Sequence, residues 1–125
     1  MLLTEIEANK LLADQDLSIP VSLVVTKQNF ASNFSEIATQ AQKLTFPVFA
    51  KAQVLHGNRA LQGLVEKVPS ADKLESTLQT LFAKQDTFGQ PIAELILEEG
   101  AEIVESYYLA LRYDTSTRKL ITLYS

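Results

Sequence analysis

Hydrophobic residues recur at three- and four-residue spacing in three segments of the chain, and this period predicts three amphipathic helices. The first segment covers 4–14 and opens with Thr4 and Glu7, which form a capping-box pattern. The second covers 30–41, and the third follows Ser70, which we expect to cap its helix. Each helix should therefore pack one apolar side against a sheet.

Short segments rich in β-branched and aromatic residues lie between and after these helices and predict strands. The predicted strands cover 21–26, 48–54, 64–68, 93–98, 105–113 and 119–124. The last two should form a hairpin around 114–118. This order of elements predicts an α/β (α+β) fold in which a mixed sheet is flanked by helices.

The strand predicted at 48–54 contains a single lysine, Lys51, among mostly apolar residues. With a period of two, the small apolar residues at every second position share one face of this strand, and Lys51 lies on the other. Burying an unpaired ammonium is expensive, so Lys51 needs a bound anion or a carboxylate such as Glu66 or Glu98. The loop that follows adds backbone amides and Arg59, which are further groups that bind anions.

The composition is that of one ordinary globular domain. The chain has 125 residues, of which 46% are hydrophobic and 21% are charged, with a formal net charge of −4. Its 11 basic residues form no stripe, which argues against nucleic acid as a partner. With no cysteine and one histidine, disulfides, thiolate metal sites and multi-histidine metal clusters are excluded. No apolar run approaches bilayer length and no signal-peptide pattern opens the chain, so we expect no membrane partner and a cytoplasmic location.

The segment 51–65 reads K-A-Q-V-x-x-G-x-R-x-x-x-G-x-V and resembles the N-terminal nucleotide-binding region of the ATP-grasp acyl-CoA ligases. This family is typified by the β-subunit of ADP-forming succinyl-CoA synthetase. The opening helix at 3–12 and the strand entry at 19–21 also resemble the family. Further matches follow in the family's order at 89–91, 96–98, 103 and 108–114. The resemblance covers nearly the whole chain and implies an ATP-grasp fold in a ligase of the tricarboxylic acid cycle type.

The resemblance also implies which residues bind the nucleotide, with ATP as the ligand. They are Lys51, Gly57, Asn58, Arg59, Ala60, Glu98 and Ser106. Lys51 and Arg59 would hold the phosphates, and Glu98 would lie near the adenosine. No catalytic residue and no metal ligand is expected within this chain.

The chain departs from the family pattern inside this nucleotide-binding set. Asn58 and Ala60 stand where the family has glycines that let the backbone close over phosphates. Leu61 replaces a loop lysine, and Ser106 replaces the second of two glutamates near the adenosine. We therefore expect nucleotide binding to be weakened.

The same resemblance implies that residues 1–125 form a single partial ATP-grasp domain. Residues 21–98 would form its small lobe, whereas 1–20 and 104–125 would belong to a second lobe that is mostly missing. The asparagine and aspartate that hold Mg²⁺ in the family would follow Ser125, so we expect this chain alone to be inactive. Its expected partners are the nucleotide and the remainder of the ligase or an α-subunit-like chain.

Apolar residues alternate in the predicted hairpin, where Tyr107, Leu109 and Leu111 share one face. We expect Ile121 and Leu123 to join them on that face. With the second lobe missing the face would be exposed, and a large exposed apolar surface is typical of an interaction site. The sequence therefore predicts a partner chain or a homo-oligomer.

Two further features are interpreted as structural. His56 has no Ser, Cys or metal-ligand partner nearby in its loop, so we give it no catalytic role. The acidic residues between 98 and 105 are interpreted as a solvated hinge rather than a metal site.

Three functional interpretations stay open at this point. The chain is the N-terminal nucleotide-binding part of an ADP-forming acyl-CoA ligase, or a degenerate ATP-grasp lobe that acts as a non-catalytic interaction or regulatory module. The third interpretation is an unrelated α/β binding domain that shares only the pattern, since likeness of fold does not assign an activity.

Overall fold

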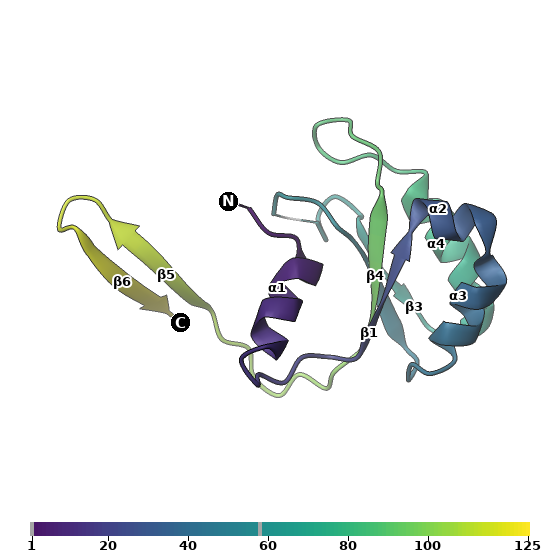
Figure 1. Ribbon diagram of the computed structural model, residues 1–125, viewed down its shortest axis with the longest axis horizontal. Coiled ribbons are helices and arrows are strands. Elements are labelled where there is room, and N and C mark those ends of the chain that lie inside the picture. The colour runs from purple at the N-terminus through teal and green to yellow at the C-terminus, as the bar shows by residue number, and fades with distance from the viewer. Residues whose placement is uncertain (1, 58) are drawn as a thin grey trace.

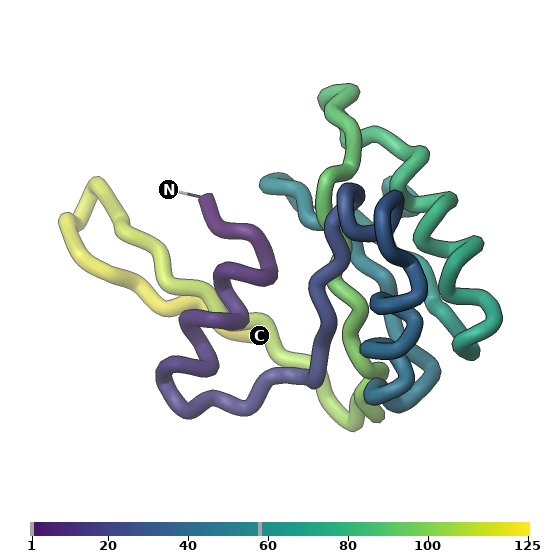
Figure 2. The backbone as a smooth tube through the Cα atoms, turned by 45° about the vertical axis from the view of Figure 1, so that its right-hand side comes forward, coloured from purple at the N-terminus to yellow at the C-terminus, as the bar shows by residue number. Residues whose placement is uncertain are grey.

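The computed structural model describes residues 2–57 and 59–125, which fold around a four-stranded sheet (Figure 1). Across the sheet the strands are β1 (Ser22–Thr26), β4 (Glu94–Glu99), β2 (Val48–Ala52) and β3 (Val65–Val68). The helices are α1 (Glu5–Ala13), α2 (Lys27–Ser32), α3 (Phe34–Ala41) and α4 (Leu74–Phe82), with a 3-10 turn (Ala71–Lys73) before α4. Helices α2, α3 and α4 cover one face of the sheet, and α1 lies on the opposite side (Figure 2).

The predicted α/β class, a sheet flanked by helices, is confirmed. The hydrogen-bonded neighbours in the sheet run antiparallel rather than mixed. Helical connections do join strands of the same direction, because β1 and β2 both pair antiparallel with β4, which lies between them. The same holds for β3 and β4, which are separated by β2. Each pair of strands joined by helices is therefore separated by a third strand of opposite direction, so that all neighbouring strands are antiparallel.

The main core lies between the sheet and helices α3 and α4. Along β2, Val48, Ala50 and Ala52 are buried and alternate with half-buried residues, as the sequence predicts. Leu78 and Leu81 of α4 are fully buried in the same cluster. Burying a leucine side chain contributes about 1.5 to 3 kcal/mol, so this face of the sheet supplies most of the stability.

The helix predicted at 30–41 is wrong in its boundaries, because the structure contains two helices there. Asn33 separates α2 from α3 with φ −153° and ψ 64°, which is not a helical conformation. Its side chain accepts a hydrogen bond from the backbone N–H of Glu36 and so caps α3. An asparagine inside an apolar period can therefore begin a new helix.

The predicted cap at Ser70 is not made. Ser70 precedes the 3-10 turn, but its hydroxyl donates to the carboxylate of Asp72 and caps no backbone amide. Helix α4 begins four residues after Ser70, at Leu74.

The capping box that opens α1 is confirmed. Thr4 accepts a hydrogen bond from the backbone N–H of Glu7, and the Glu7 carboxylate accepts one from the backbone N–H of Thr4 at 2.7 Å. None of the described residues of α1 is buried, and Leu11 and Leu12 are 53% and 44% exposed. Apolar packing therefore contributes little to the position of this helix.

Strands β5 (Leu109–Asp114) and β6 (Lys119–Tyr124) form a hairpin that projects away from the sheet (Figure 1). The exposed apolar face predicted there is present, since Leu109 and Leu111 are each 72% exposed. Asp114 pairs with Lys119, so odd-numbered residues of β5 lie opposite even-numbered residues of β6.

This register corrects the predicted membership of the hairpin face. Leu120 and Tyr124 join Leu109 and Leu111, whereas Ile121 and Leu123 pair with the residues that point to the other side. The number of residues in the turn sets the strand register, and the register decides which residues of β6 share a face with those of β5.

We expect Leu97→Ala to lower the free energy of unfolding by about 2 to 5 kcal/mol, because Leu97 is fully buried on the central strand β4 and its truncation leaves a cavity. Urea unfolding followed by circular dichroism measures the change. Leu61→Ala is the control, because Leu61 is 87% exposed and should change stability by less than about 0.5 kcal/mol. Equal unfolding midpoints for the two variants would contradict the assignment of the core.

Candidate functional site

The face of the sheet opposite the main core is polar where β2 and β4 meet. Lys51 lies opposite Ile96 and Phe49 lies opposite Glu98 in the antiparallel register, so Lys51 and Glu98 are diagonal neighbours on one face. The Lys51 Nζ atom is 2.6 Å from Glu98 Oε1. The strand alternation that buries the alanines of β2 thus presents Lys51 on the side of α1.

Helix α1 supplies a second carboxylate to this place. Glu5 is the first residue of α1, and its Oε1 is 3.1 Å from Lys51 Nζ. Its Oε2 is 2.7 Å from Arg59 Nη2, and Arg59 Nη1 donates to the carbonyl of Ala52 at 3.1 Å. Glu5, Lys51, Arg59 and Glu98 form the group that we call the charge cluster.

The cluster shifts the pKa values of Glu5 and Lys51. Burial alone would raise the pKa of the Glu5 carboxyl, but its interactions with Arg59 and Lys51 are stronger together and hold the pKa below its ordinary value of 4.5. Burial likewise lowers the pKa of the Lys51 ammonium, but Glu98 and Glu5 outweigh it and raise the pKa above 10.5. Both groups are therefore charged across the neutral range.

A hollow of about 280 Å³ opens beside the cluster. Its polar wall is formed by Lys51 and Glu98, and its apolar wall includes Phe49 and Ile103. Pro20, Glu99 at the end of β4, Gly100 and Ala101 complete the lining. This arrangement offers one ammonium for an anion, one carboxylate for a hydroxyl or amine, and apolar surface for a flat ring.

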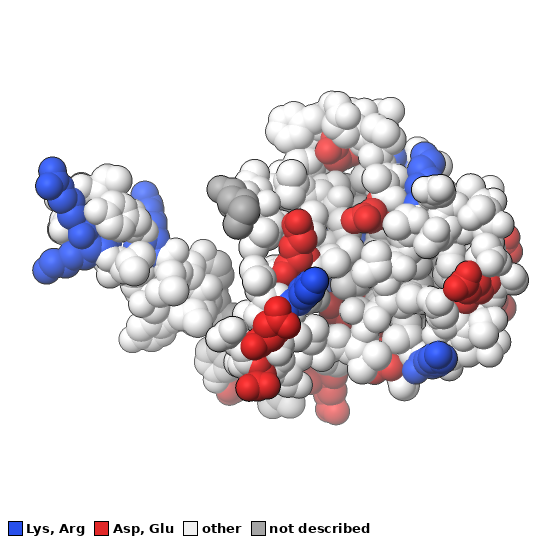
Figure 3. Space-filling model, viewed as in Figure 1, with Lys and Arg blue, Asp and Glu red and all other residues white. Residues whose placement is uncertain are grey.

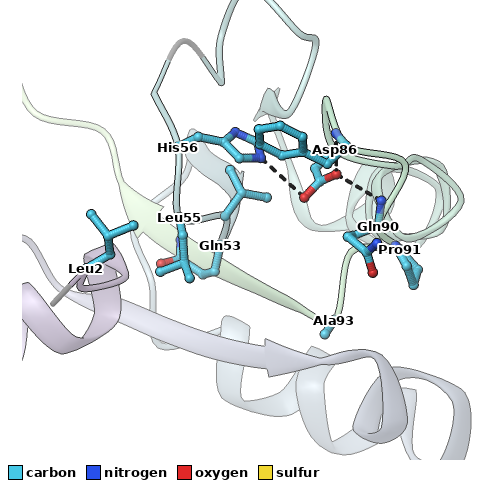
Figure 4. Close-up of a pocket in the computed structure, with 10 residues that line it drawn as sticks. Leu2, Gln53, Leu55, His56, Asp86, Gln90, Pro91 and Ala93 are labelled. Atoms are coloured by element: carbon cyan, nitrogen blue, oxygen red, sulfur yellow. Dashed lines mark hydrogen bonds and ion pairs between the residues drawn. The ribbon is translucent and has the colours of Figure 1, made fainter.

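A second hollow of about 530 Å³ lies between the loop after β2 and the loop before β4 (Figure 4). Leu2, which precedes α1, also lines it. His56 Nε2 lies 3.2 Å from Asp86 Oδ2, and the His56 ring packs edge-on against Phe88. The other carboxylate oxygen of Asp86 accepts backbone hydrogen bonds from Phe88 and Gln90. His56 thus ties two loops together.

The ionised carboxylate of Asp86 holds this loop by accepting its backbone hydrogen bonds. The backbone hydrogen bond from Gln90 is the largest influence on its pKa, which lies below the ordinary value despite some desolvation, and the contact with His56 acts in the same direction.

The structure brings together three of the residues predicted to bind the nucleotide, namely Lys51, Arg59 and Glu98. Gly57 and Ala60 lie exposed in the loop between β2 and β3, and Asn58 lies outside the described residues.

Ser106 is exposed in the segment before β5, and among the described residues no hydrogen bond joins it to the charge cluster.

Sequence reasoning missed Glu5, because its partners lie 46 or more positions away in the chain. Of the two carboxylates expected for Lys51, Glu98 is confirmed, whereas Glu66 pairs with Lys84 at 3.2 Å instead. The only signal for Glu5 was its place in the opening segment of the family pattern, one position after the helix cap.

The wider surface adds little to this site. Within the described part of the chain, no group of three or more His, Cys, Asp or Glu residues is arranged to hold a metal ion. Basic side chains gather toward the tip of the hairpin on the face shown in Figure 3, whereas acidic ones are scattered over the rest of that face. Over residues 2–57 and 59–125, no helix has both the length and the apolar character needed to cross a membrane.

Comparison with known proteins identifies the fold family. A sequence model described as the ATP-grasp domain matches residues 2–125. The chain belongs to the ATP-grasp family. The resemblance seen in the segment 51–65 is therefore confirmed over nearly the whole length.

The relatives of this ATP-grasp chain include β-subunits of ADP-forming succinate–CoA ligase. The chain is 30% identical to the one from Aquifex aeolicus over 100% of its own length and 32% of the relative. It is also 30% identical to the one from Staphylothermus marinus, over 100% of its length and 31% of the relative. A subunit of an ADP-forming sulfoacetate–CoA ligase from Bilophila wadsworthia is 26% identical over 97% of the chain and 30% of the relative. The ATP-grasp chain thus spans about a third of the length of the relatives that it matches.

We expect the contact between α1 and the sheet to depend on pH. Because the pKa of Glu5 is lower in the folded protein, its contribution is complete above 4.5 and is lost as pH falls through the lower folded value. Because the pKa of Lys51 is higher, its contribution is complete below 10.5 and is lost as pH rises through the higher folded value. The amide resonance of Ile6, which donates to Gln53 Oε1, reports the contact in an NMR titration.

In this titration the main acid transition of Ile6 should be lost in Glu5→Gln, leaving a smaller change from Glu7, whose hydrogen bonds with Thr4 also lower its pKa. The main transition should persist in Glu7→Gln, because Glu7 acts within the capping box and does not contact Lys51. An identical acid transition in wild type and Glu5→Gln would show that the ion pairs do not hold α1.

Proposed function

We propose that this chain is the N-terminal nucleotide-binding part of an ADP-forming acyl-CoA ligase. Lys51 and Arg59 bind the phosphates of ATP, assisted by backbone amides at 57–60. Glu98 accepts a hydrogen bond from the adenosine, and the adenine ring packs in the hollow beside Phe49. A cytoplasmic location is part of this proposal.

The observation that carries the proposal is the pair of cations beside that hollow. Arg59 and Lys51 contact the two oxygens of one carboxylate, which places them close enough to share one phosphate group. Lys51 also lines the hollow together with Glu98. The relatives that match the whole chain are subunits of ligases that form ADP, which supports a nucleotide as the ligand.

Magnesium has a separate place in this proposal. A divalent cation spreads the charge that develops during phosphoryl transfer. By the family resemblance, in which an asparagine and an aspartate outside the matched segment hold Mg²⁺, we propose that the ligands for Mg²⁺ come from outside this chain, and that the chain alone binds nucleotide without turning it over.

A second candidate function is a non-catalytic interaction or regulatory module. It is favoured by the charge cluster itself, whose two cations already have carboxylate partners. It is also favoured by the exposed apolar face of the hairpin, where Leu109 and Leu111 are each 72% exposed.

Binding of ATP to this chain should be weak and should depend on Lys51. Lys51→Ala should lower the affinity at least about tenfold, because it removes a charge-assisted contact to a phosphate. Isothermal titration calorimetry with ATP, and with GTP in parallel, measures the change. Lys67→Ala is the control, since Lys67 is an exposed lysine of β3 outside the charge cluster.

Two results would contradict the site. Tight binding that survives Lys51→Ala would place the nucleotide elsewhere. Equal losses in Lys51→Ala and Lys67→Ala would show that only the overall charge of the chain matters.

We further propose that the hairpin face binds another polypeptide, either the remainder of the ligase, an α-subunit-like chain or a second copy. The names of the relatives describe subunits, which supports an assembly. A two-stranded sheet also leaves both edges open for pairing, and its apolar face is exposed. For the chain by itself we choose a second copy as the occupant.

The chain should therefore form a dimer or higher oligomer at high concentration, and Leu111→Asp should return it to a monomer. Light scattering coupled to size exclusion measures the mass. Leu61→Asp is the control, because it places the same charge on another exposed leucine far along the chain from the hairpin. A wild-type chain that stays monomeric at every concentration would rule out self-association and leave a different chain as the occupant.

A further inference from the structure

The two cations of the charge cluster are held in place by groups other than Glu5. Arg59 is anchored through its Nη1 atom to the carbonyl of Ala52, at the end of β2. Lys51 is anchored by Glu98 on the adjacent strand, with 2.6 Å between Nζ and Oε1. The sheet and its loop therefore preorganise a position for an anion, and α1 is not needed to build it.

Glu5 fills this position with a carboxylate, but the fit is incomplete. Its Oε1 accepts a hydrogen bond from Lys51 at 3.1 Å. Its Oε2 lies 2.7 Å from Arg59 Nη2 in an ion pair whose alignment is poor for a hydrogen bond. A carboxylate therefore reaches both cations but is not ideally placed toward Arg59, and a phosphate, with more oxygens at other angles, would use Arg59 better.

Helix α1 has few other contacts that resist its removal. None of its described residues is fully buried, although Ile6, Ala8 and Asn9 are half-buried, and the backbone N–H of Ile6 makes a single hydrogen bond, 3.2 Å long, to Gln53 Oε1 on the sheet side. A helix of nine residues that depends on polar contacts is easily displaced.

We propose that Glu5 is an internal competitor for the phosphate position: a phosphate ligand displaces its carboxylate from Lys51 and Arg59 and thereby releases α1 from the sheet. This inference rests on the proposed function, because it concerns the same two cations. It adds that nucleotide affinity is set by a residue of α1, and that binding and helix docking exclude each other.

The charges in the cluster explain the direction of the effect. Two cations and two carboxylates balance, so an incoming phosphate meets a neutral group while Glu5 is in place. Removing the charge of Glu5 leaves one net positive charge beside the hollow. By linkage, whatever free energy α1 docking gains from Glu5 must be given up when the phosphate binds, so the two equilibria oppose each other by the same factor.

The test uses inorganic pyrophosphate and ADP with the full chain, titrated by calorimetry at low salt. Glu5→Gln should bind pyrophosphate roughly tenfold more tightly than wild type, within the usual range of coupling between sites. Glu66→Gln removes the same charge from a carboxylate that pairs with Lys84 outside the cluster, and it should bind as wild type does. Lys51→Ala should bind most weakly.

A second measurement follows the helix directly. In wild type, pyrophosphate should change the chemical shift of the Ile6 amide, because its hydrogen bond to Gln53 is lost. It should also speed amide hydrogen exchange across α1, while the resonances of the sheet core stay unchanged. In Glu5→Gln these changes should already be present before ligand is added. Unchanged core resonances also show that the variant is folded.

Several results would overturn the inference. If Glu5→Gln binds pyrophosphate no better than wild type while Lys51→Ala loses binding, Glu5 is no competitor and only the proposed function stands. If pyrophosphate binds without disturbing Ile6, docking and binding do not exclude each other. If neither wild type nor Glu5→Gln binds pyrophosphate or ADP, both the inference and the proposed function fail.

Discussion

The ammonium of Lys51, half-buried on the sheet face opposite the main core, is the constraint on which the rest of the site depends. Removing an ammonium from water costs several kcal/mol unless carboxylates are close enough to offset the loss. The antiparallel register of β2 with β4 brings Glu98 to it, and the first turn of α1 brings Glu5. The contact with Glu5 and the hydrogen bond from Ile6 to Gln53 link α1 to the sheet, and α1 has no fully buried residue among those described.

The two faces of the sheet are therefore stabilised by different forces. On one face, Ile37 and Ala41 of α3, the leucines of α4 and apolar residues of the strands pack into a core that depends little on pH or salt. On the other face, ion pairs of partly exposed side chains hold α1, and such pairs are individually weak and are screened by salt. A rigid platform thus carries a helix whose attachment responds to charge.

Much of this arrangement could be predicted from the sequence, because it follows from local periods. The alternation in β2 placed Lys51 on the face away from the core, and Thr4 with Glu7 marked the start of α1. Errors arose where one residue changes a local rule. Asn33 divided a helix that the apolar period had made continuous, and the pairing of Asp114 with Lys119 shifted the face of β6 by one residue.

The pairing of Glu5 with Lys51 and Arg59 could not be derived in the same way. It joins the helix start to a strand and a loop far along the chain, and only the packed structure shows which carboxylate reaches which cation. Two features oppose phosphate binding in the proposed site, and they differ physically. The substitutions at Asn58 and Ala60 act on how the loop backbone can approach phosphates, an effect of neutral amides that salt hardly screens. Glu5 acts through charge, over a distance at which salt screens partly exposed groups. The contribution of the loop is therefore a fixed property of the sequence, whereas the contribution of Glu5 varies with ionic strength, with pH and with anything that draws α1 away from the sheet.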